Sequence, residues 1–158
     1  MRVALLTVSD SVAQGQRKDL SGPAVKERCT SLGWQVVNAH VVPDEVSVIQ
    51  ARLIELADAE IVDLILTTGG TGIGPRDVTP EACVGVCERL LPGIGEVMRE
   101  VGRRSNPRAA LSRSLAGVRK HALIVNLPGS PKGAVESLDA IAELLPHAVE
   151  VLRGSGHD

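Results

Sequence analysis

The chain alternates short apolar runs with longer segments of helical period, and this alternation constrains its fold more than any other feature. Four short runs, rich in β-branched residues, are Val3 to Val8, Val36 to Val42, Leu64 to Thr68 and Ala122 to Leu127. Continuous apolar runs of this length are typical of parallel strands whose two faces are both covered by helices. The pattern therefore predicts an α/β fold: a doubly wound, mostly parallel sheet flanked by helices in three layers, α/β/α.

Local signals place a helix after each of the first three strands. A side-chain oxygen at Ser21 and a proline at position 23 suit the start of the first helix, and Gly33 suits its end. Asp44 can cap the second helix. The third opens at Thr79-Pro80-Glu81, where a capping hydroxyl, a proline and an acid all favour a helix N-terminus.

The second half of the chain is less regular. Pro92 and Gly93 precede an amphipathic stretch from Ile94 to Arg104, which we expect to be helical. Alternating polarity from Ala110 to Val118 predicts a further strand. One last helix should follow the break at Pro128-Gly129, and the residues after Arg153 resemble a frayed tail.

Composition limits the number of domains and the class of partner. A chain of 158 residues that is 44% hydrophobic forms one domain, residues 1–158, with a core large enough to need no disulfide or structural metal. A formal net charge of −2, with one Trp and no Phe or Tyr, argues against nucleic acid as a partner. No apolar stretch approaches the length that spans a bilayer, so we expect no membrane partner.

Cysteine usage favours a reducing compartment. Cys29, Cys83 and Cys87 are odd in number and lack the spacing of a disulfide framework, so we expect a soluble, cytoplasmic protein. The apolar run at the N-terminus is too short for a signal peptide. Cys83 and Cys87 should share one helix face, either as buried thiols or as half of a zinc site whose other two ligands are not evident in the sequence.

The most informative segment runs from Leu64 to Ala82 and predicts a buried strand, a glycine-rich loop and a capped helix. Such a loop presents consecutive backbone N–H groups beside a helix N-terminus, where an anion is stabilised, and glycines let a phosphate approach closely. The segment is not a Walker A loop, because no Gly-Lys-Ser/Thr follows, and it does not fit the dinucleotide pattern. The alternative is that the four glycines only permit a tight crossover turn.

Two carboxylates should lie on the same rim of the sheet as this loop. Asp44 follows the second strand and Asp77 follows the third, and ligands of open α/β sheets bind beyond the carboxyl ends of the strands. Paired carboxylates facing a phosphate loop suit Mg²⁺, which is commonly shared between one or two carboxylates and substrate phosphates. Simple helix capping is the alternative for Asp44. Polar or small residues after the first and last strands complete the rim: Ser9, Asp10, Asn126 and Gly129.

A basic segment offers further candidates for phosphate recognition. Between Arg99 and Lys120 there are seven basic residues and one acid, Glu100. Arginine suits bidentate contact with phosphate, and Arg113 and Arg119 are favoured because they fall in or beside the predicted strand. A solvated helix face is the alternative for the rest of the segment.

Eight motifs, in order along nearly the whole chain, resemble one known family. They are Leu6-Thr7-Val8-Ser9-Asp10, Asp19-Leu20-Ser21-Gly22-Pro23, Val42-Pro43-Asp44-Glu45, Thr67-Thr68-Gly69-Gly70-Thr71-Gly72, Pro75-Arg76-Asp77-Val78-Thr79-Pro80-Glu81-Ala82, Leu111-Ser112-Arg113-Ser114, Ala116-Gly117-Val118-Arg119 and Asn126-Leu127-Pro128-Gly129-Ser130-Pro131-Lys132. This set resembles the molybdopterin adenylyltransferases of molybdenum-cofactor biosynthesis, of the MogA/MoaB type, which includes the G domain of gephyrin.

The resemblance implies a reaction and its participants. Molybdopterin and Mg-ATP would give adenylylated molybdopterin and pyrophosphate, with ATP as substrate and Mg²⁺ as cofactor. The family is commonly a homotrimer, and a molybdate-inserting enzyme is a possible partner. The run Pro75-Arg76-Asp77-Val78-Thr79-Pro80, absent from relatives that look non-catalytic, favours an active enzyme.

The resemblance also implies roles for single residues. Asp44 and Asp77 match the aspartates used in adenylyl transfer and would hold Mg²⁺. The nucleotide would be bound by Gly69, Gly70, Thr71 and Gly72. The pterin and its phosphate would be bound by Thr7, Ser9, Asp19, Ser112, Arg113 and Ser114.

Three other functions stay open from the residues alone. A module of the same fold could bind or scaffold molybdopterin without turnover. A regulatory domain could use only the glycine loop, binding ATP irrespective of molybdopterin. An enzyme could act on a different phosphorylated substrate, because fold and loop alone do not choose the chemistry.

Overall fold

A computed structural model describes residues 1–155 and contains one six-stranded sheet in the order β2-β1-β3-β6-β5-β4. The strands are β1 (Arg2–Val8), β2 (Gln35–Val42), β3 (Leu64–Thr68), β4 (Arg89–Leu90), β5 (Ala116–Arg119) and β6 (Ala122–Leu127). Strands β2, β1, β3 and β6 are parallel, while β5 runs antiparallel to both of its neighbours at one edge. The predicted doubly wound, mostly parallel sheet is confirmed.

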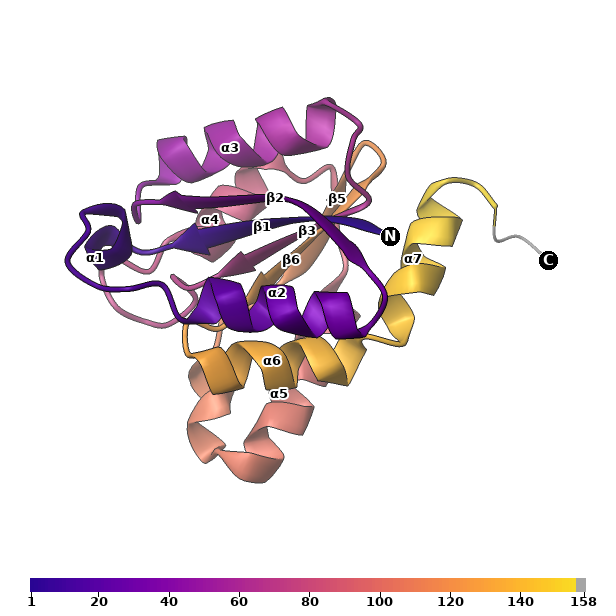
Figure 1. Cartoon of the computed structure of the whole chain (residues 1–158). Coiled ribbons are helices and arrows are strands. Elements are labelled where there is room, and N and C mark those ends of the chain that lie inside the picture. Colours follow the sequence, from indigo (N-terminus) through magenta and orange to yellow (C-terminus); the bar gives the residue numbers. More distant parts are fainter. Residues whose placement is uncertain (156–158) are drawn as a thin grey trace.

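Helices cover both faces of the sheet (Figure 1). Their bounds are α1 (Asp10–Ala13), α2 (Ser21–Ser31), α3 (Val46–Asp58), α4 (Thr79–Val86), α5 (Pro92–Ser105), α6 (Pro131–Ile141) and α7 (Leu144–Leu152), with a 3-10 helix at Pro107–Leu111. Helices α3 and α4 pack on one face, and α2, α5, α6 and α7 pack on the other. The three-layer α/β/α arrangement is therefore confirmed. None of the helices in the described part of the chain has the length and apolar character that a membrane span requires.

The period of two along β1 divides the core into two layers. Val3 and Leu5 point into the layer under α2, α6 and α7, whereas Ala4 and Leu6 point into the layer under α3 and α4. All four are almost fully buried. Because both faces are covered, β1 shows a continuous apolar run rather than alternating polarity.

The order of the strands sets the place of the site. The chain leaves β1 toward β2 on one side, then crosses back to place β3 on the other side of β1. Loops that leave neighbouring strands in opposite directions open a crevice at the carboxyl edge of the sheet, where ligands of this fold class bind. In Figure 1 this edge lies on the side of α1.

Several expected elements are wrong in detail. The strand expected from Ala110 to Val118 is a 3-10 helix, Pro107–Leu111, followed by the shorter β5. The single last helix is two, because Pro146 has no N–H to donate and its ring would clash with the carbonyl of Ala142 in a continuous helix. Neither the short α1 nor β4 was expected.

The three expected capping side chains serve other purposes. The hydroxyl of Ser21 forms a hydrogen bond with Thr68 Oγ1 at 2.9 Å instead of capping α2. Glu45, not Asp44, occupies the N-cap position of α3. The hydroxyl of Thr79 donates to the carbonyl of Gly69 at 2.9 Å. These polar groups join separate segments around the crevice rather than stabilise helix ends.

Candidate functional site

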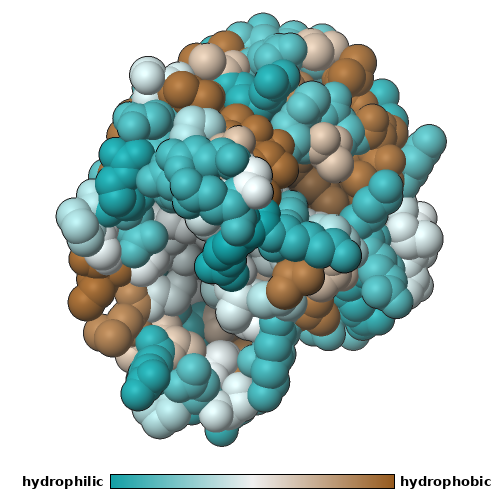
Figure 2. All heavy atoms as spheres, turned by 60° about the vertical axis from the view of Figure 1, so that its left-hand side comes forward, coloured by the Kyte–Doolittle hydropathy of each residue, from teal (hydrophilic) through white to brown (hydrophobic). Residues whose placement is uncertain are grey.

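Two neighbouring cavities open at the carboxyl edge of the sheet. The first, here called the acidic cavity, has a volume of about 450 Å³ and is lined by Thr7, Ser9, Arg17, Lys18, Asp19, Asp44, Gly69, Gly70, Asp77 and their neighbours. The second, here called the α5 cavity, has about 410 Å³ and is lined by Thr71, Gly72, Ile73, Met98, Arg99, Ser112 and their neighbours. Gly129 and Ser130 line both. Figure 2 turns this edge toward the viewer and shows a pale hollow between hydrophilic rims.

The glycine loop after β3 separates the two cavities and has a backbone conformation that residues other than glycine rarely adopt. Gly69 and Gly70 have φ angles of +95° and +68°. A Cβ on Gly69 would lie 2.3 Å from the carbonyl oxygen of Val8, and one on Gly70 would lie 2.2 Å from Thr79 Oγ1. The loop therefore packs directly on β1 and on the start of α4.

Asp44 lies against this loop from the segment that follows β2, with β1 between that strand and β3 in the sheet. Its Oδ1 is 3.1 Å from the position that a Cβ on Gly70 would occupy, while its Oδ2 accepts a hydrogen bond from the N–H of Asp10 at 2.8 Å. Burial raises the pKa of the Asp44 carboxyl, and the negative charges of Asp10 and Asp77 raise it further. A cation between these carboxylates would relieve that repulsion.

Asp77 approaches the same cavity from the far end of the loop. Its Oδ2 accepts a hydrogen bond from the N–H of Gly74 at 2.9 Å, which closes a tight turn. A Cβ on Gly72 or Gly74 would come within 2.8 Å of this oxygen. Both aspartates line the acidic cavity, as the sequence predicted.

The donor set of the acidic cavity fits Mg²⁺. Within residues 1–155, no hydrogen bond reaches Oδ1 of Asp44 or of Asp77, so each carboxylate keeps an oxygen available. No group of three or more His, Cys, Asp or Glu that could hold a metal occurs in the described part of the chain. Two carboxylates with the remaining positions left for water and phosphate is the arrangement that Mg²⁺ commonly adopts.

Thr7, Ser9 and Asp19, predicted to contact the pterin, all line the acidic cavity. The hydroxyl of Thr7 donates to Asp19 Oδ2 at 2.7 Å, and the N–H of Gly22 donates to Asp19 Oδ1 at 3.0 Å. The hydroxyl of Ser9 accepts from the N–H of Val12 at 3.3 Å as the N-cap of α1. The hydrogen bonds from Thr7 and Gly22 hold the carboxylate of Asp19 in a fixed orientation.

The three residues of the second predicted pterin motif, Ser112 to Ser114, lie in different surroundings. Ser112 lines the α5 cavity, and its hydroxyl donates to that of Ser114, which is buried, at 3.0 Å. Arg113 lines neither cavity. Its guanidinium donates to the carbonyls of Gly72 and Asp77, both at 2.7 Å, and pairs with Glu81. Arg113 therefore contacts the glycine loop and the start of α4, and its contact with the pterin stays a prediction.

Arg119, the other favoured arginine of the basic segment, lies away from both cavities. Its guanidinium pairs with Asp58 at 2.9 and 3.1 Å and donates to the carbonyl of Val86. It joins α3 to α4 and β5, so the expectation of phosphate contact at Arg119 is wrong. Arg99 does line the α5 cavity, where its guanidinium donates to the carbonyls of Ser112 and Ser114.

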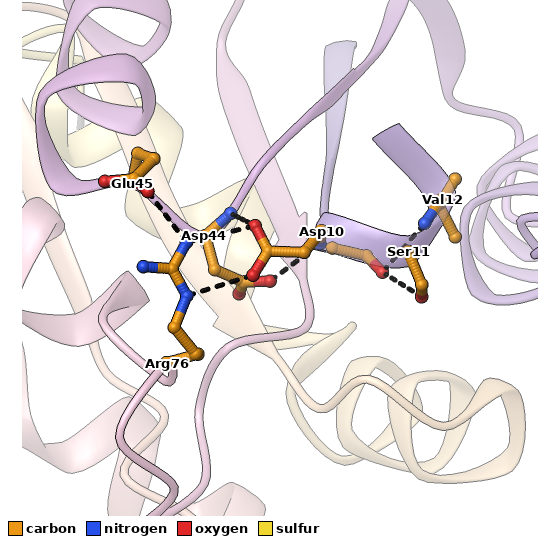
Figure 3. Close-up of polar contacts among 7 residues, drawn as sticks. Asp10, Ser11, Val12, Asp44, Glu45 and Arg76 are labelled. Carbon is orange, nitrogen blue, oxygen red and sulfur yellow. Dashed lines mark hydrogen bonds and ion pairs between the residues drawn. The ribbon is translucent and has the colours of Figure 1, made fainter. Parts of the chain in front are cut away.

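Sequence reasoning missed several residues that shape the site. Asp10 and Arg76 contact each other and the backbone or neighbours of Asp44 (Figure 3), and Thr79 holds the start of the glycine loop. The sequence indicates Asp10 only as part of a polar rim. No periodicity or spacing signals that an arginine in one loop will meet an aspartate in another.

Of the two interpretations of Cys83 and Cys87, the structure favours packed thiols. Cys83 is buried against Asn126, whose side-chain amide donates to the sulfur at 2.9 Å. Burial raises the pKa of Cys83 to about 12 and that of Cys87 to about 11. Both therefore stay as neutral thiols at neutral pH.

The fold and the site together define a class: doubly wound α/β proteins with a glycine loop between two cavities at the carboxyl edge of the sheet. Comparison with known proteins identifies the family within this class. The family described as "Probable molybdopterin binding domain" matches residues 4–147, and the chain belongs to it.

Similar relatives extend over nearly the whole chain. A protein named molybdopterin adenylyltransferase in Helicobacter pylori (strain J99) is 40% identical over 98% of this chain and 89% of its own length. A protein of the same name in Escherichia coli (strain K12) is 37% identical over 98% of this chain and 86% of its own length. The crystal structure of the molybdopterin biosynthesis enzyme MoaB from Thermus thermophilus has a TM-score of 0.91 and 50% identity, covering 97% and 96% of the two chains.

These comparisons confirm the expected MogA/MoaB-type family and its place in molybdenum-cofactor biosynthesis. They also confirm the expectation of an enzyme of the nucleotidyltransferase class.

Proposed function

We propose that this protein transfers AMP from Mg-ATP to the terminal phosphate of molybdopterin, with release of pyrophosphate. The observation that carries the proposal is the convergence of Asp44 and Asp77 on one cavity beside the glycine loop. Relatives at 37–40% identity that are named molybdopterin adenylyltransferase support the choice of substrates. The proposed setting is a cytoplasmic homotrimer that passes its product to a molybdate-inserting enzyme.

The site suits a reaction that needs charge stabilisation more than proton transfer. The attacking phosphate is already largely ionised at neutral pH, so neither Asp44 nor Asp77 has to act as a base. Mg²⁺ held by these carboxylates would neutralise charge on the α-phosphate and the departing pyrophosphate. Asp77 is the proposed first ligand, and Asp44 is a second ligand or orients the first.

The backbone around the cavities supplies the positioning. Gly69 and Gly70 line the acidic cavity, whereas Thr71 and Gly72 line the α5 cavity, so the loop faces both. The N-terminus of α6, with Ser130 as its N-cap, also lies at both cavities and favours a negative charge there. We propose that the phosphates of the two substrates meet over this boundary. Thr7, Ser9 and Asp19 at the acidic cavity and Ser112 at the α5 cavity would contact the pterin and its phosphate from the two sides of this boundary. Arg113 would hold the glycine loop beside them, and Ser114 would orient Ser112.

Asp77→Asn tests the assignment of the ion to this pair. The variant removes one charge and changes one oxygen to NH₂, so we expect a stable protein that still binds molybdopterin but transfers AMP at least about a hundredfold more slowly. Adenylylated molybdopterin is measured by mass spectrometry after incubation with Mg-ATP and molybdopterin. Asp139→Asn, in an exposed pair with Arg28 far along α6, is the matched control and should keep wild-type turnover.

Two results would contradict the proposal. Wild-type turnover by Asp77→Asn would show that this carboxylate is not needed for transfer. Binding of molybdopterin by the wild-type protein without product, under conditions where a known adenylyltransferase works, would instead indicate a non-catalytic molybdopterin-binding or scaffold protein of this fold.

A further inference from the structure

Asp10 and Asp44, which follow the neighbouring strands β1 and β2, are joined by hydrogen bonds (Figure 3), and Asp44 lines the acidic cavity. The N–H of Asp10 donates to Asp44 Oδ2 at 2.8 Å, and the N–H of Asp44 donates to Asp10 Oδ1 at 3.0 Å. Each aspartate therefore accepts from the backbone of the other. This reciprocal pairing fixes the side-chain torsions of both residues and joins the end of β1 to the end of β2.

Arg76, which follows the glycine loop in the sequence, contacts Asp10 of this pair. Its Nε donates to Asp10 Oδ2 at 3.0 Å and its Nη2 donates to Asp10 Oδ1 at 3.2 Å, a bidentate contact. Nη2 also donates to Glu45 Oε1 at 2.8 Å. The hydrogen bond from Arg76 lowers the pKa of the Asp10 carboxyl, so Asp10 remains an anion at neutral pH.

The contacts decide which oxygen of Asp44 faces the cavity. Oδ2 is held by the N–H of Asp10, which leaves Oδ1 directed at the backbone of Gly70 and the cavity that both line. An ion pair between Arg76 and Asp44 itself would have occupied that oxygen. Asp10 instead receives the guanidinium and leaves Asp44 Oδ1 available.

Arg76 also links the two carboxylates of the site through the chain itself. Asp77 follows Arg76 directly in the sequence. The hydrogen bonds from the Arg76 guanidinium to Asp10 therefore also restrict the position of Asp77. The distance between Asp44 and Asp77 thus depends on the contacts of Asp10 with Asp44 and with Arg76, here called the tie. Ligand geometry at Mg²⁺ is strict, so a looser tie weakens the site.

We propose that Asp10, held by Arg76, is a positioning residue for Asp44, keeping one oxygen of that carboxylate turned toward the divalent cation of the nucleotide. This inference rests on the proposed function, since it assigns a role within the same cation site. It concerns residues that touch neither the cation nor the substrates, and so act through Asp44 and the loop.

The position of the tie distinguishes this role from simple stabilisation. The side chains of Arg76 and Asp10 are 56% and 31% exposed. Ion pairs of this exposure contribute little to folding stability. Residues that orient a ligand of a metal, in contrast, commonly change its affinity by about 10- to 100-fold. Loss of the tie should therefore affect cation binding far more than stability.

The test compares Asp10→Ala and Arg76→Gln with two matched controls. Asp139→Ala removes a carboxylate from an exposed pair with Arg28, and Arg52→Gln removes a guanidinium from an exposed pair with Glu55. Binding of Mn²⁺ in the presence of a non-hydrolysable ATP analogue is measured by electron paramagnetic resonance, with no turnover required. The half-saturating Mg²⁺ concentration and the thermal midpoint are measured for the same proteins.

We expect the Mn²⁺ dissociation constant and the half-saturating Mg²⁺ concentration to rise at least about tenfold in Asp10→Ala and Arg76→Gln. High Mg²⁺ should restore much of the lost rate in these variants but not in Asp44→Asn. Asp10→Asn, which keeps an oxygen for the N–H of Asp44 but loses the bidentate contact, should be intermediate. Both controls should match the wild-type protein.

Each remaining outcome gives a definite answer. Unchanged Mn²⁺ affinity in Asp10→Ala and Arg76→Gln, with an active wild-type protein, overturns the positioning role. A fall in Mn²⁺ affinity that only follows a large fall in the thermal midpoint overturns it as well. A wild-type protein that binds Mn²⁺ through Asp44 but makes no product contradicts the proposed function and leaves the positioning role measurable.

Discussion

At the scale of single residues, the site depends on Gly70, which has no side chain. Asp44 can place Oδ1 against the loop only because Gly70 has no side chain, and the φ of +68° at Gly70 is one that other residues rarely adopt. The sequence predicts that the glycines and both aspartates gather at one edge of the sheet, because these residue types follow strand ends, and they do line the two cavities there. It does not indicate that Asp44 would bind the N–H of Asp10 instead of capping α3, since that contact joins residues 34 positions apart.

Gly70→Ala tests this dependence. The new Cβ would overlap Thr79 Oγ1 and press on Asp44 Oδ1, so we expect nucleotide-dependent Mn²⁺ affinity to fall at least about tenfold, with a loss of stability above the roughly 1–2 kcal/mol of left-handed strain. Gly15→Ala is the matched control, because Gly15 has a φ of +73° and nothing within 4 Å of its Cβ position. Calorimetry and thermal denaturation measure both quantities. Equal effects of the two substitutions would contradict the account.

At the scale of elements, the strand, glycine loop and helix from Leu64 to Ala82 follow the sequence prediction closely. There the local signals agree: a buried run, glycines, then Thr-Pro-Glu. The segment from Ala110 to Val118 does not follow it. Its first residues form a 3-10 helix beside α5, and Arg113 leaves the expected strand to hold the glycine loop. Alternating polarity there reflects tertiary contacts that no local pattern encodes.

Arg113→Lys tests whether this arginine acts as a tie on the loop. Lysine keeps the charge but cannot reach the carbonyls of Gly72 and Asp77 and the carboxylate of Glu81 together. We expect amide hydrogen exchange in residues 70–78 to become at least about tenfold faster, with little change in β1 or β3. Arg103→Lys, on the exposed side of α5, is the control. Unchanged exchange in the loop would indicate that the guanidinium contacts do not hold it.

At the scale of the whole molecule, one buried carboxylate joins both ends of the described chain. Asp63, just before β3, accepts from the N–H of Arg2 at 2.7 Å and pairs with the guanidinium groups of Arg2 and Arg153. Its side chain is only 5% exposed. Burial alone would raise the pKa of Asp63, but hydrogen bonds from Arg2 and the charge of Arg153 outweigh it and lower the pKa. The sequence gives no hint of this contact, because its partners lie 61 and 90 positions away.

Asp63→Asn should reduce the free energy of unfolding at pH 7 by about 1–3 kcal/mol, because it leaves charged donors without a charged partner. A carboxyl whose pKa is lowered by folding contributes stability above its unfolded pKa of about 3.9, and this contribution disappears as pH falls through the folded pKa. The difference between variant and wild-type protein should thus shrink below about pH 4. Urea denaturation across pH measures it, with Asp139→Asn as the control. A difference that does not change with pH would contradict the linkage.

The shared wall of the two cavities has a consequence for the later fate of a bound molecule. Gly129 and Ser130 border both spaces, and Gly129 lies close against Gly69, with a Cβ there only 3.3 Å from the Gly69 Cα. Compounds that occupy the two spaces separately can leave one at a time. A single compound that fills both cavities must release both of its ends together. While one end stays bound, it keeps the other end at a high effective concentration beside its cavity. We therefore expect the joined compound to dissociate more slowly than either precursor. An acceptor that removes it would then determine the overall turnover rate.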